Sequence, residues 1–331
     1  MVFGMPFLLI TIIAIALVFD FLNGLHDSSN IVATMISSRA LTPRKALGMT
    51  AIAEFAGPFL FGVAVATTIG SEVVDPAAVS SAVIIAALSG AIVWNLITWY
   101  FGWPSSTSHA LIGGLIGSVA VAEGFDTIHL AGLEKVLIAL FISPVLGFVL
   151  GLLVVKAIYF LARGATPSVN TLFKRGQWGT SMALALSHGT NDAQKTMGII
   201  AMAMVTTGYV AEFQVPWWVI TLSAGAIALG TLTGGWRLIR TLGGKFYKIR
   251  PVHAFGSQIA SAATILGAAL LGGPVSTTQV VSSAIMGAGS ADRVSKVRWT
   301  VARDIAVAWV LTIPVAGLLA AGLYLLIDLI L

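Results

Sequence analysis

The sequence has no cysteine among its 331 residues, so disulfide bonds cannot contribute to the fold and cysteine usage does not indicate an oxidising or a reducing compartment. Charge is scarce as well, because Asp, Glu, Lys and Arg make up only 9% of the chain, against roughly 25% in an ordinary soluble domain. Apolar residues make up 57%. This composition excludes a typical soluble domain and indicates an integral membrane protein.

Several functional motifs are absent too. The chain has no HExxH, GxSxG or Walker A sequence and no soluble segment large enough to bind ATP. It has no basic stripe interleaved with stacking aromatics, which argues against nucleic acid as a partner. Its first residues lack a basic leader and a small-residue cleavage site, so we expect the first apolar run to be a retained span.

Long apolar runs dominate what is present. The runs that begin at Leu133 and Arg303 exceed the roughly 20 residues that a helix needs to cross a bilayer. They also lack the period-2 alternation of outer-membrane strands. We predict an all-α membrane protein of about 10–12 transmembrane helices, including broken or re-entrant helices.

The few charges predict an orientation. Fifteen of the 18 Lys and Arg fall in four short segments: 39–45, 163–175, 237–250 and 293–303. The other connections carry mainly acidic residues: Glu72, Asp75, Glu123, Asp126 and Glu212. By the positive-inside rule the basic segments are cytoplasmic. We expect a multi-pass protein of the cell (inner or plasma) membrane with both termini outside.

The predicted crossings fall into two sets of five. The spans are 5–37, 46–69, 77–100, 105–122 and 134–162, then 178–208, 216–236, 254–272, 276–291 and 304–327. Because five is odd, the second set enters from the opposite side, as in many secondary transporters. We predict an inverted repeat at 1–162, a basic cytoplasmic connection at 163–177 and a second repeat at 178–331.

Two motif pairs support an internal duplication. "NGLHDSSN" from Asn23 corresponds to "SHGTNDAQ" from Ser187, which pairs Asp27 with Asp192. "PSSTSH" from Pro104 corresponds to "PVSTTQ" from Pro274. The two pairs occur in the same order and at nearly constant offsets, which chance does not readily explain.

The Pro-Ser/Thr motifs predict helix starts. Proline is tolerated at the first helical position and Ser or Thr is favoured at the N-cap. The free N–H groups and the dipole at such a start favour an anion. If two starts meet near the midplane, they form one site; the plainer alternative is two well-capped helices. The predicted substrate-binding residues are Ser105, Ser106, Thr107, Ser108, Ser276, Thr277 and Thr278, with Asp27 and Asp192.

The two aspartates predict cation sites, because buried carboxylates in a membrane are costly. Each has glycine and small polar residues beside it, which favours a locally unwound helix with free carbonyls. Alternatively, each aspartate caps a broken helix. The predicted coupling-ion residues are His26, Asp27, Asn30, Thr190, Asn191, Asp192 and Gln194.

Carboxylates beside an anion site favour phosphate over sulfate. Monohydrogen phosphate can donate its O–H to an ionised aspartate, whereas sulfate has no proton to donate. The same acids can take Na⁺ through hard oxygen ligands or H⁺ through protonation.

The four motifs together resemble the duplicated signatures of the PiT family of inorganic phosphate transporters. The resemblance implies two inverted repeats, a transport part and a scaffold part in a dimer, phosphate between the two helix starts, and coupling ions near the aspartates. Leu25-His26-Asp27 resembles the bacterial "GFHD" form, which is associated with proton coupling and metal-phosphate substrates, more than the sodium-coupled "GAND" form.

Other polar residues carry weaker hypotheses. His26 is either a proton carrier or a hydrogen-bond partner of the backbone. Lys195 pairs with an aspartate or touches phosphate, and Glu54 faces protein. The accessory candidates are Glu54, His109 and Lys195; His188 is expected to pack between helices. Asp20 and Asp304 are expected at span ends, and the GxxxG of Gly113 and Gly117 at a helix contact.

The combined prediction is a secondary active symporter, and not an enzyme, that imports inorganic phosphate, free or as a metal-phosphate complex, by alternating access. Its expected partners are phosphate, Na⁺ or H⁺, the lipid bilayer and a second copy of the chain; no cofactor or fixed metal is expected. The alternatives are a transporter of another oxyanion such as sulfate, an ion channel, and an intramembrane enzyme using Ser106 with His109.

Overall fold

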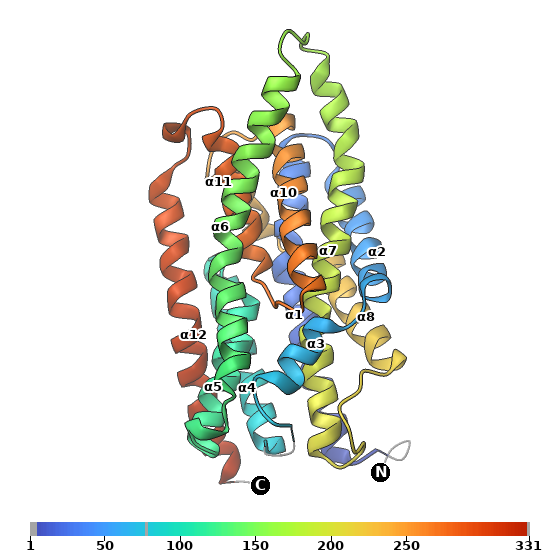
Figure 1. Cartoon of the computed structure of the whole chain (residues 1–331), viewed down its shortest axis with the longest axis vertical. Helices are drawn as coiled ribbons and strands as arrows, with labels where there is room; N and C mark the ends of the chain where they lie inside the picture. Colours follow the sequence, from blue (N-terminus) through green and yellow to red (C-terminus); the bar gives the residue numbers. More distant parts are fainter. Residues whose placement is uncertain (1–4, 77–78, 330–331) are drawn as a thin grey trace.

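The computed structural model describes residues 5–76 and 79–329, which form an elongated bundle of helices (Figure 1). The elements of the first half are α1 (Phe7–Ser37), α2 (Pro43–Phe61), α3 (Ala64–Thr67), the π-helix η1 (Thr68–Glu72), α4 (Ser81–Phe101), α5 (Thr107–Ala122), the 3₁₀ helix η2 (Phe125–Thr127) and α6 (Leu130–Leu161). Those of the second half are α7 (Val169–Thr206), α8 (Trp217–Thr233), α9 (Trp236–Gly244), α10 (Pro251–Leu270), α11 (Thr277–Ser290), the 3₁₀ helix η3 (Val294–Lys296) and α12 (Trp299–Asp328).

The two halves correspond element by element. Each has a long first helix, a bent helix pair, a helical hairpin and a long last helix with an internal proline, Pro144 in α6 and Pro314 in α12. The bent pairs turn by 77° at α2/α3 and by 72° at α8/α9. In Figure 1, α1 runs away from the end where both termini lie, and α7 runs toward it. The predicted inversion is therefore present, although α7 begins inside the segment that we expected to be a connection.

Two hairpins replace four of the predicted crossings. α4 and α5 enter from the end that carries the termini, and α10 and α11 enter from the other end (Figure 1). α5 and α11 have only 16 and 14 residues, or about 24 and 21 Å, too short for a hydrocarbon core of about 30 Å. Four helices of the described chain are long and apolar enough to span a membrane, or six when each bent pair counts as one.

The predicted unwinding at the aspartates is wrong. α1 and α7 continue without a break through Asp27 and Asp192. The glycines of these motifs serve close packing: a Cβ on Gly24 would lie 2.0 Å from the carbonyl oxygen of Ile227, and one on Gly189 would lie 2.2 Å from that of Glu54. The breaks lie instead at Gly62 and Gly234, whose φ angles of +80° and +75° suit glycine.

A polar layer separates two hydrophobic cores. On α1, one core takes residues between Leu9 and Phe19 and the other takes residues between Ile31 and Met35. On α7, the same two cores take residues from Ala193 onward and residues 184–185. Asp27 and Asp192 lie between the cores, so the fold keeps both carboxylates at mid-height in its interior.

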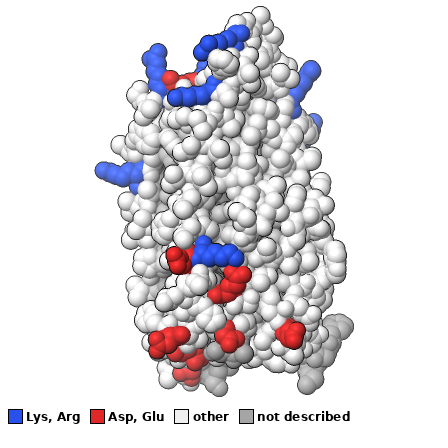
Figure 2. Space-filling model, viewed as in Figure 1, with Lys and Arg blue, Asp and Glu red and all other residues white. Residues whose placement is uncertain are grey.

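The outer surface fits a membrane. Most Lys and Arg of the visible face lie toward one end and most Asp and Glu toward the other, where a basic patch also lies among the acids, and most of the surface between is uncharged (Figure 2). We call these the basic end and the acidic end. The GxxxG prediction is confirmed, because Cβ atoms on Gly113 and Gly117 would lie 2.4 and 2.2 Å from carbonyl oxygens of α12.

Candidate functional site

The starts of α5 and α11 meet in the polar layer. Ser106 and Ser276 are the N-caps, and each accepts a hydrogen bond from the backbone N–H three residues later, at 3.1 and 3.3 Å. The Ser108 hydroxyl donates to the carbonyl oxygen of Val275 across the two hairpins at 3.0 Å. α5 runs from this point toward the acidic end and α11 toward the basic end (Figure 1). The two N-termini therefore face one another, which concentrates free N–H groups and positive dipole ends there.

Asp27 of α1 accepts hydrogen bonds from the second half. Thr278 donates to its Oδ1 at 2.8 Å, and Thr277 donates to its Oδ2 at 3.1 Å. The Thr107 hydroxyl lies 3.5 Å from the same Oδ2 and 2.8 Å from Oδ1 of Asn23. Both helix starts thus reach the Asp27 carboxylate.

Asp192 of α7 has a different partner set. Its Oδ1 pairs with Lys195, one turn along the same helix, and its Oδ2 lies 3.0 Å from the Thr277 hydroxyl. Lys195 is only 1% exposed and also donates to the hydroxyl of Ser108 at 2.5 Å and to the carbonyl of Val275 at 2.9 Å. A buried ammonium group needs such partners, so Lys195 ties Asp192 to both helix starts.

One hydroxyl bridges the two carboxylates. Thr277 lies within hydrogen-bond distance of both Asp27 and Asp192, but its single proton can satisfy only one of them. His188 Nε2 lies 3.7 Å from Asp27 Oδ2 and 3.2 Å from Asp192 Oδ2. One ligand atom from each of Asp27, His188 and Asp192 lies within 4.8 Å of the other two. The group can hold a cation, or His188 can supply the positive charge itself.

His188 and Glu54 belong to this layer. The His188 Nδ1 atom lies 2.9 Å from Oε1 of Glu54, and both side chains are fully buried. Glu54 faces protein, as expected. For His188, packing between helices was favoured over a relay role. Its spacing of four residues from Asp192, which places both on one helix face, was the signal in the sequence.

Three residues predicted to bind the coupling ion make hydrogen bonds to the backbone, and their role as ion ligands stays a prediction. Gln194 accepts from the backbone N–H groups of Val65 and Ala66 at the start of α3, the second part of the broken span, and donates to Gly62 O. Asn191 holds the loop before α11 through Gly273 O and Val275 N. Thr190 donates to the backbone of its own helix.

The remaining predicted residues lie around the same centre. Asn30 donates to Thr278 at 3.0 Å, and its Oδ1 has no hydrogen-bond partner in the described chain. His26 Nδ1 lies 3.9 Å from Asp27, with Nε2 3.4 Å from Thr98 Oγ1, which in turn accepts from Ser105. The His109 ring interacts with Ser106 at 2.7 Å.

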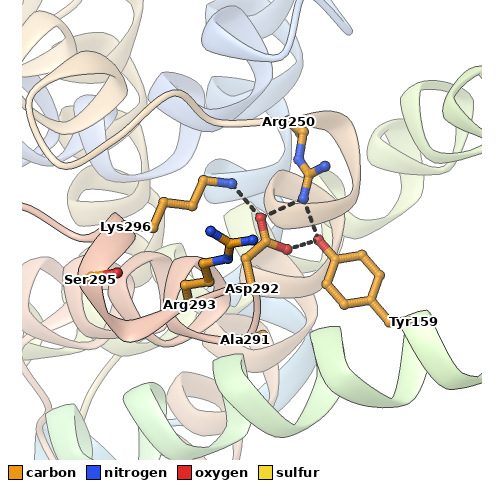
Figure 3. A pocket seen from close by; sticks show the side chains of 7 residues that line it. All are labelled: Tyr159, Arg250, Ala291, Asp292, Arg293, Ser295 and Lys296. Atoms are coloured by element: carbon orange, nitrogen blue, oxygen red, sulfur yellow. Dashed lines mark hydrogen bonds and ion pairs between the residues drawn. The ribbon is translucent and has the colours of Figure 1, made fainter.

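A second charged cluster, drawn in Figure 3, lies at the basic end, toward which α11 runs from the centre (Figure 1). Asp292, in the loop after α11, pairs with Arg250 at 2.5 Å and also with Lys296 and Tyr159. These residues line a cavity of about 700 Å³ with Arg293. Burial raises the pKa of Asp292, but its hydrogen bonds from Lys296 and Tyr159 and the nearby positive charges outweigh it and lower that pKa to about 2.

Comparisons with known proteins agree with the geometry. Residues 23–320 match the family described as "Phosphate transporter family". The chain is 48% identical over 325 residues to a "Probable low-affinity inorganic phosphate transporter" of Rhizobium meliloti, which covers 98% of this chain and 97% of the relative. A protein of the same description from Bacillus subtilis is 43% identical, with 98% of each chain covered. A solved structure titled "The sodium-dependent phosphate transporter" superimposes with a TM-score of 0.88 at 25% identity and covers 98% of this chain and 100% of its own.

Proposed function

Because the chain belongs to the phosphate transporter family, we propose that it is a secondary active symporter that imports inorganic phosphate together with H⁺ or Na⁺. Phosphate, free or complexed with a metal, binds between the starts of α5 and α11, and the two repeats alternate in exposing this site to either side. The protein works in the cell membrane as a homodimer, with the basic end cytoplasmic and both termini outside. It is a transporter and not an enzyme.

The observation that carries this proposal is the Thr277 hydroxyl between two buried carboxylates, where two helix N-termini meet. The N-termini and Lys195 attract an anion. The carboxylates repel any anion that lacks a proton, and they accept the O–H of monohydrogen phosphate. This combination supports phosphate over sulfate.

The same geometry supports coupling. Asp27 and Asp192 bring two negative charges into a low-dielectric layer that has Lys195 as its buried ammonium group. An incoming phosphate adds further negative charge, so a cation bound at Asp27 and Asp192 lowers the cost of binding phosphate there. Because linkage is reciprocal, phosphate and the cation tighten each other's binding.

Labelled phosphate uptake into proteoliposomes tests the proposal. Pure lipid vesicles serve as the blank, Na⁺ and H⁺ gradients are imposed separately, and excess sulfate is the competitor. We expect one gradient to drive accumulation and sulfate to compete weakly. Sulfate displacing phosphate, or equal uptake with and without both gradients, contradicts the proposal. Asp27→Asn and Asp192→Asn should abolish driven uptake while Asp304→Asn, an exposed aspartate of α12, leaves it intact.

A further inference from the structure

Asp20 lies in the interior, not at a span end as expected. It is in the middle of α1 and fully buried. Neither oxygen of its carboxylate makes a well-formed hydrogen bond in the described part of the chain. An ionised carboxylate without partners in a membrane interior is costly, so the group is either neutral or bound to a cation.

Two further orphan groups face Asp20. The side chains that interact with its carboxyl group are Thr196 of α7 and Asn23 of α1. The Thr196 hydroxyl and the Asn23 Nδ2 amide are themselves buried without a hydrogen-bond partner among the described residues. The three groups form a small polar site that the mechanism above does not use.

This site lies beside the central layer, toward the acidic end. Asp20 precedes Asp27 by seven residues, or about two turns of α1, and Thr196 follows Asp192 by four residues, or about one turn of α7. α1 begins and α7 ends near the acidic end (Figure 1). A solute that enters from the acidic end reaches the level of Asp20 before that of Asp27 and Asp192.

The donors and acceptors around Asp20 match a protonated carboxyl group. Such a group has one O–H to donate, which the Thr196 hydroxyl can accept, and a carbonyl oxygen that can accept from the Asn23 amide. Na⁺ requires several oxygen ligands, whereas the free group of Asn23 is an N–H donor. The local chemistry therefore favours a proton.

The charges around Asp20 are few. Lys195 attracts and Asp192 repels its negative form, and both come from α7. α8, which packs along α1, has no titratable residue, and α4 has only Tyr100 near its far end. The other titratable residues on elements packed against α1 lie farther toward the basic end than Asp20: Arg44, Lys45 and Glu54 on α2, Lys174, Arg175 and His188 on α7, Arg237 and Arg240 on α9, and His253 on α10.

We propose that Asp20 is a proton-binding site on the acidic-end side of the phosphate site, and that its proton travels with phosphate. This inference rests on the proposed function. Asn23 provides the link, because its Oδ1 accepts from Thr107 at the start of α5 while its side chain also interacts with the carboxyl group of Asp20. Loss of the proton leaves a carboxylate that can only accept hydrogen bonds, so Thr196 must donate where it accepted before and the Asn23 amide is attracted more strongly. Through Asn23 this change disturbs the helix start that binds phosphate.

The test compares Asp20→Asn with Asp304→Asn, which also removes an aspartate charge but at an exposed position of α12. Two rates are measured in proteoliposomes: accumulation driven by a pH gradient, and exchange of internal for external phosphate without a gradient. We expect the ratio of accumulation to exchange to fall at least tenfold in Asp20→Asn and to stay within twofold in Asp304→Asn. An equal ratio in wild type and Asp20→Asn overturns the inference while leaving the proposed function intact.

Other outcomes separate the two proposals. Absence of phosphate exchange in the wild type contradicts the proposed function itself. Accumulation driven only by a Na⁺ gradient overturns the assignment of a proton to Asp20. Infrared difference spectra after a pH jump give a readout besides transport: the stretch of a protonated carboxyl group should be present in wild type and missing in Asp20→Asn. Should that variant fail to fold, Thr196→Val should shift the pH at which the same band disappears, and an unshifted band counts against the inference.

Discussion

The two halves place matching aspartates on α1 and α7 but surround them differently. Asp27 accepts hydrogen bonds from Thr277 and Thr278, whose hydroxyls belong to the other half. Asp192 pairs with Lys195 of its own helix. Lys195 has no basic counterpart in the first half, where the residue three positions after Asp27 is Asn30.

Because of this difference, the negative charges of the two aspartates are balanced in different ways. The charge of Asp192 is balanced by an ammonium group that the fold holds in place. Asp27 has no ammonium partner among the described residues: its hydrogen bonds come from the Thr277 and Thr278 hydroxyls, which can rotate to donate to phosphate instead. The rings of His26 and His188 lie farther off, at 3.9 and 3.7 Å. In the proposed mechanism the cation bound at the two acids therefore balances mainly the charge of Asp27, while Asp192 with Lys195 also holds the two helix starts together.

Lys195→Met removes the basic residue that distinguishes Asp192 from Asp27, and we expect the largest effect from this change. It leaves Asp192 buried without its ammonium partner, and removing one member of a buried pair costs roughly 3–5 kcal/mol. We expect little folded protein, seen as a lower unfolding temperature in detergent, and no phosphate uptake. The double variant Lys195→Met/Asp192→Asn removes both charges and should regain much of the folded yield but not transport. A single variant as stable as wild type would falsify the structural role of the pair.

Thr277→Val and Thr107→Val compare the two helix starts at matched positions. Thr277 reaches both carboxylates, whereas Thr107 lies 3.5 Å from Asp27 and donates to Asn23. We expect phosphate affinity, measured by equilibrium binding, to fall about tenfold for Thr277→Val, equivalent to about 1.4 kcal/mol. Thr107→Val should have a smaller effect. Equal losses, or a larger loss for Thr107→Val, would mean that the halves contribute alike.

Much of this arrangement could be predicted from the sequence. The helix starts follow from the local chemistry of Pro, Ser and Thr, and Ser106 and Ser276 are indeed N-caps. The inversion could be predicted because the Lys and Arg segments mark the cytoplasmic side, and an odd number of predicted crossings in the first set makes the second set start from the opposite side. The internal duplication showed which residues would meet.

What could not be predicted depends on contacts between distant helices. Glycine beside an aspartate suits an unwound helix and a close helix crossing equally well, and only the packing of Gly24 on Ile227 decides between them. Asp20 reads as a boundary residue until α7 is placed beside it. Gln194 resembles an ion ligand in sequence, yet the break at Gly62 creates orphan N–H groups that need its amide oxygen.

Asp292→Asn tests a further difference between the halves, in the loops that follow α11 and α5. Of the predicted changes, its effect is the smallest. The loop after α11 holds Asp292 among Arg250, Lys296 and Tyr159, whereas the corresponding loop after α5 carries Glu123 and Asp126. Because the folded-state pKa of Asp292, about 2, lies below the ordinary value of an unfolded aspartate, about 3.9, its stabilisation is fully present above pH 4 or so and is lost as the pH falls through about 2. Because the Asp292 carboxylate is partly exposed, solvent screens its ion pairs and limits that stabilisation to roughly 1–2 kcal/mol.

The measurement is the unfolding temperature of purified protein in detergent between pH 7 and pH 2.5, with Asp304→Asn as the exposed control. Asp292→Asn should unfold at a lower temperature than wild type at pH 7, and the gap should narrow below about pH 4, where the wild-type carboxylate begins to lose its advantage over the unfolded state. Phosphate uptake at pH 7 should change less than twofold, because Asp292 touches neither helix start. A gap that stays constant down to pH 2.5 would show that the ion pairs around Asp292 do not stabilise the basic end, whereas a large loss of uptake would place this cluster on the transport path.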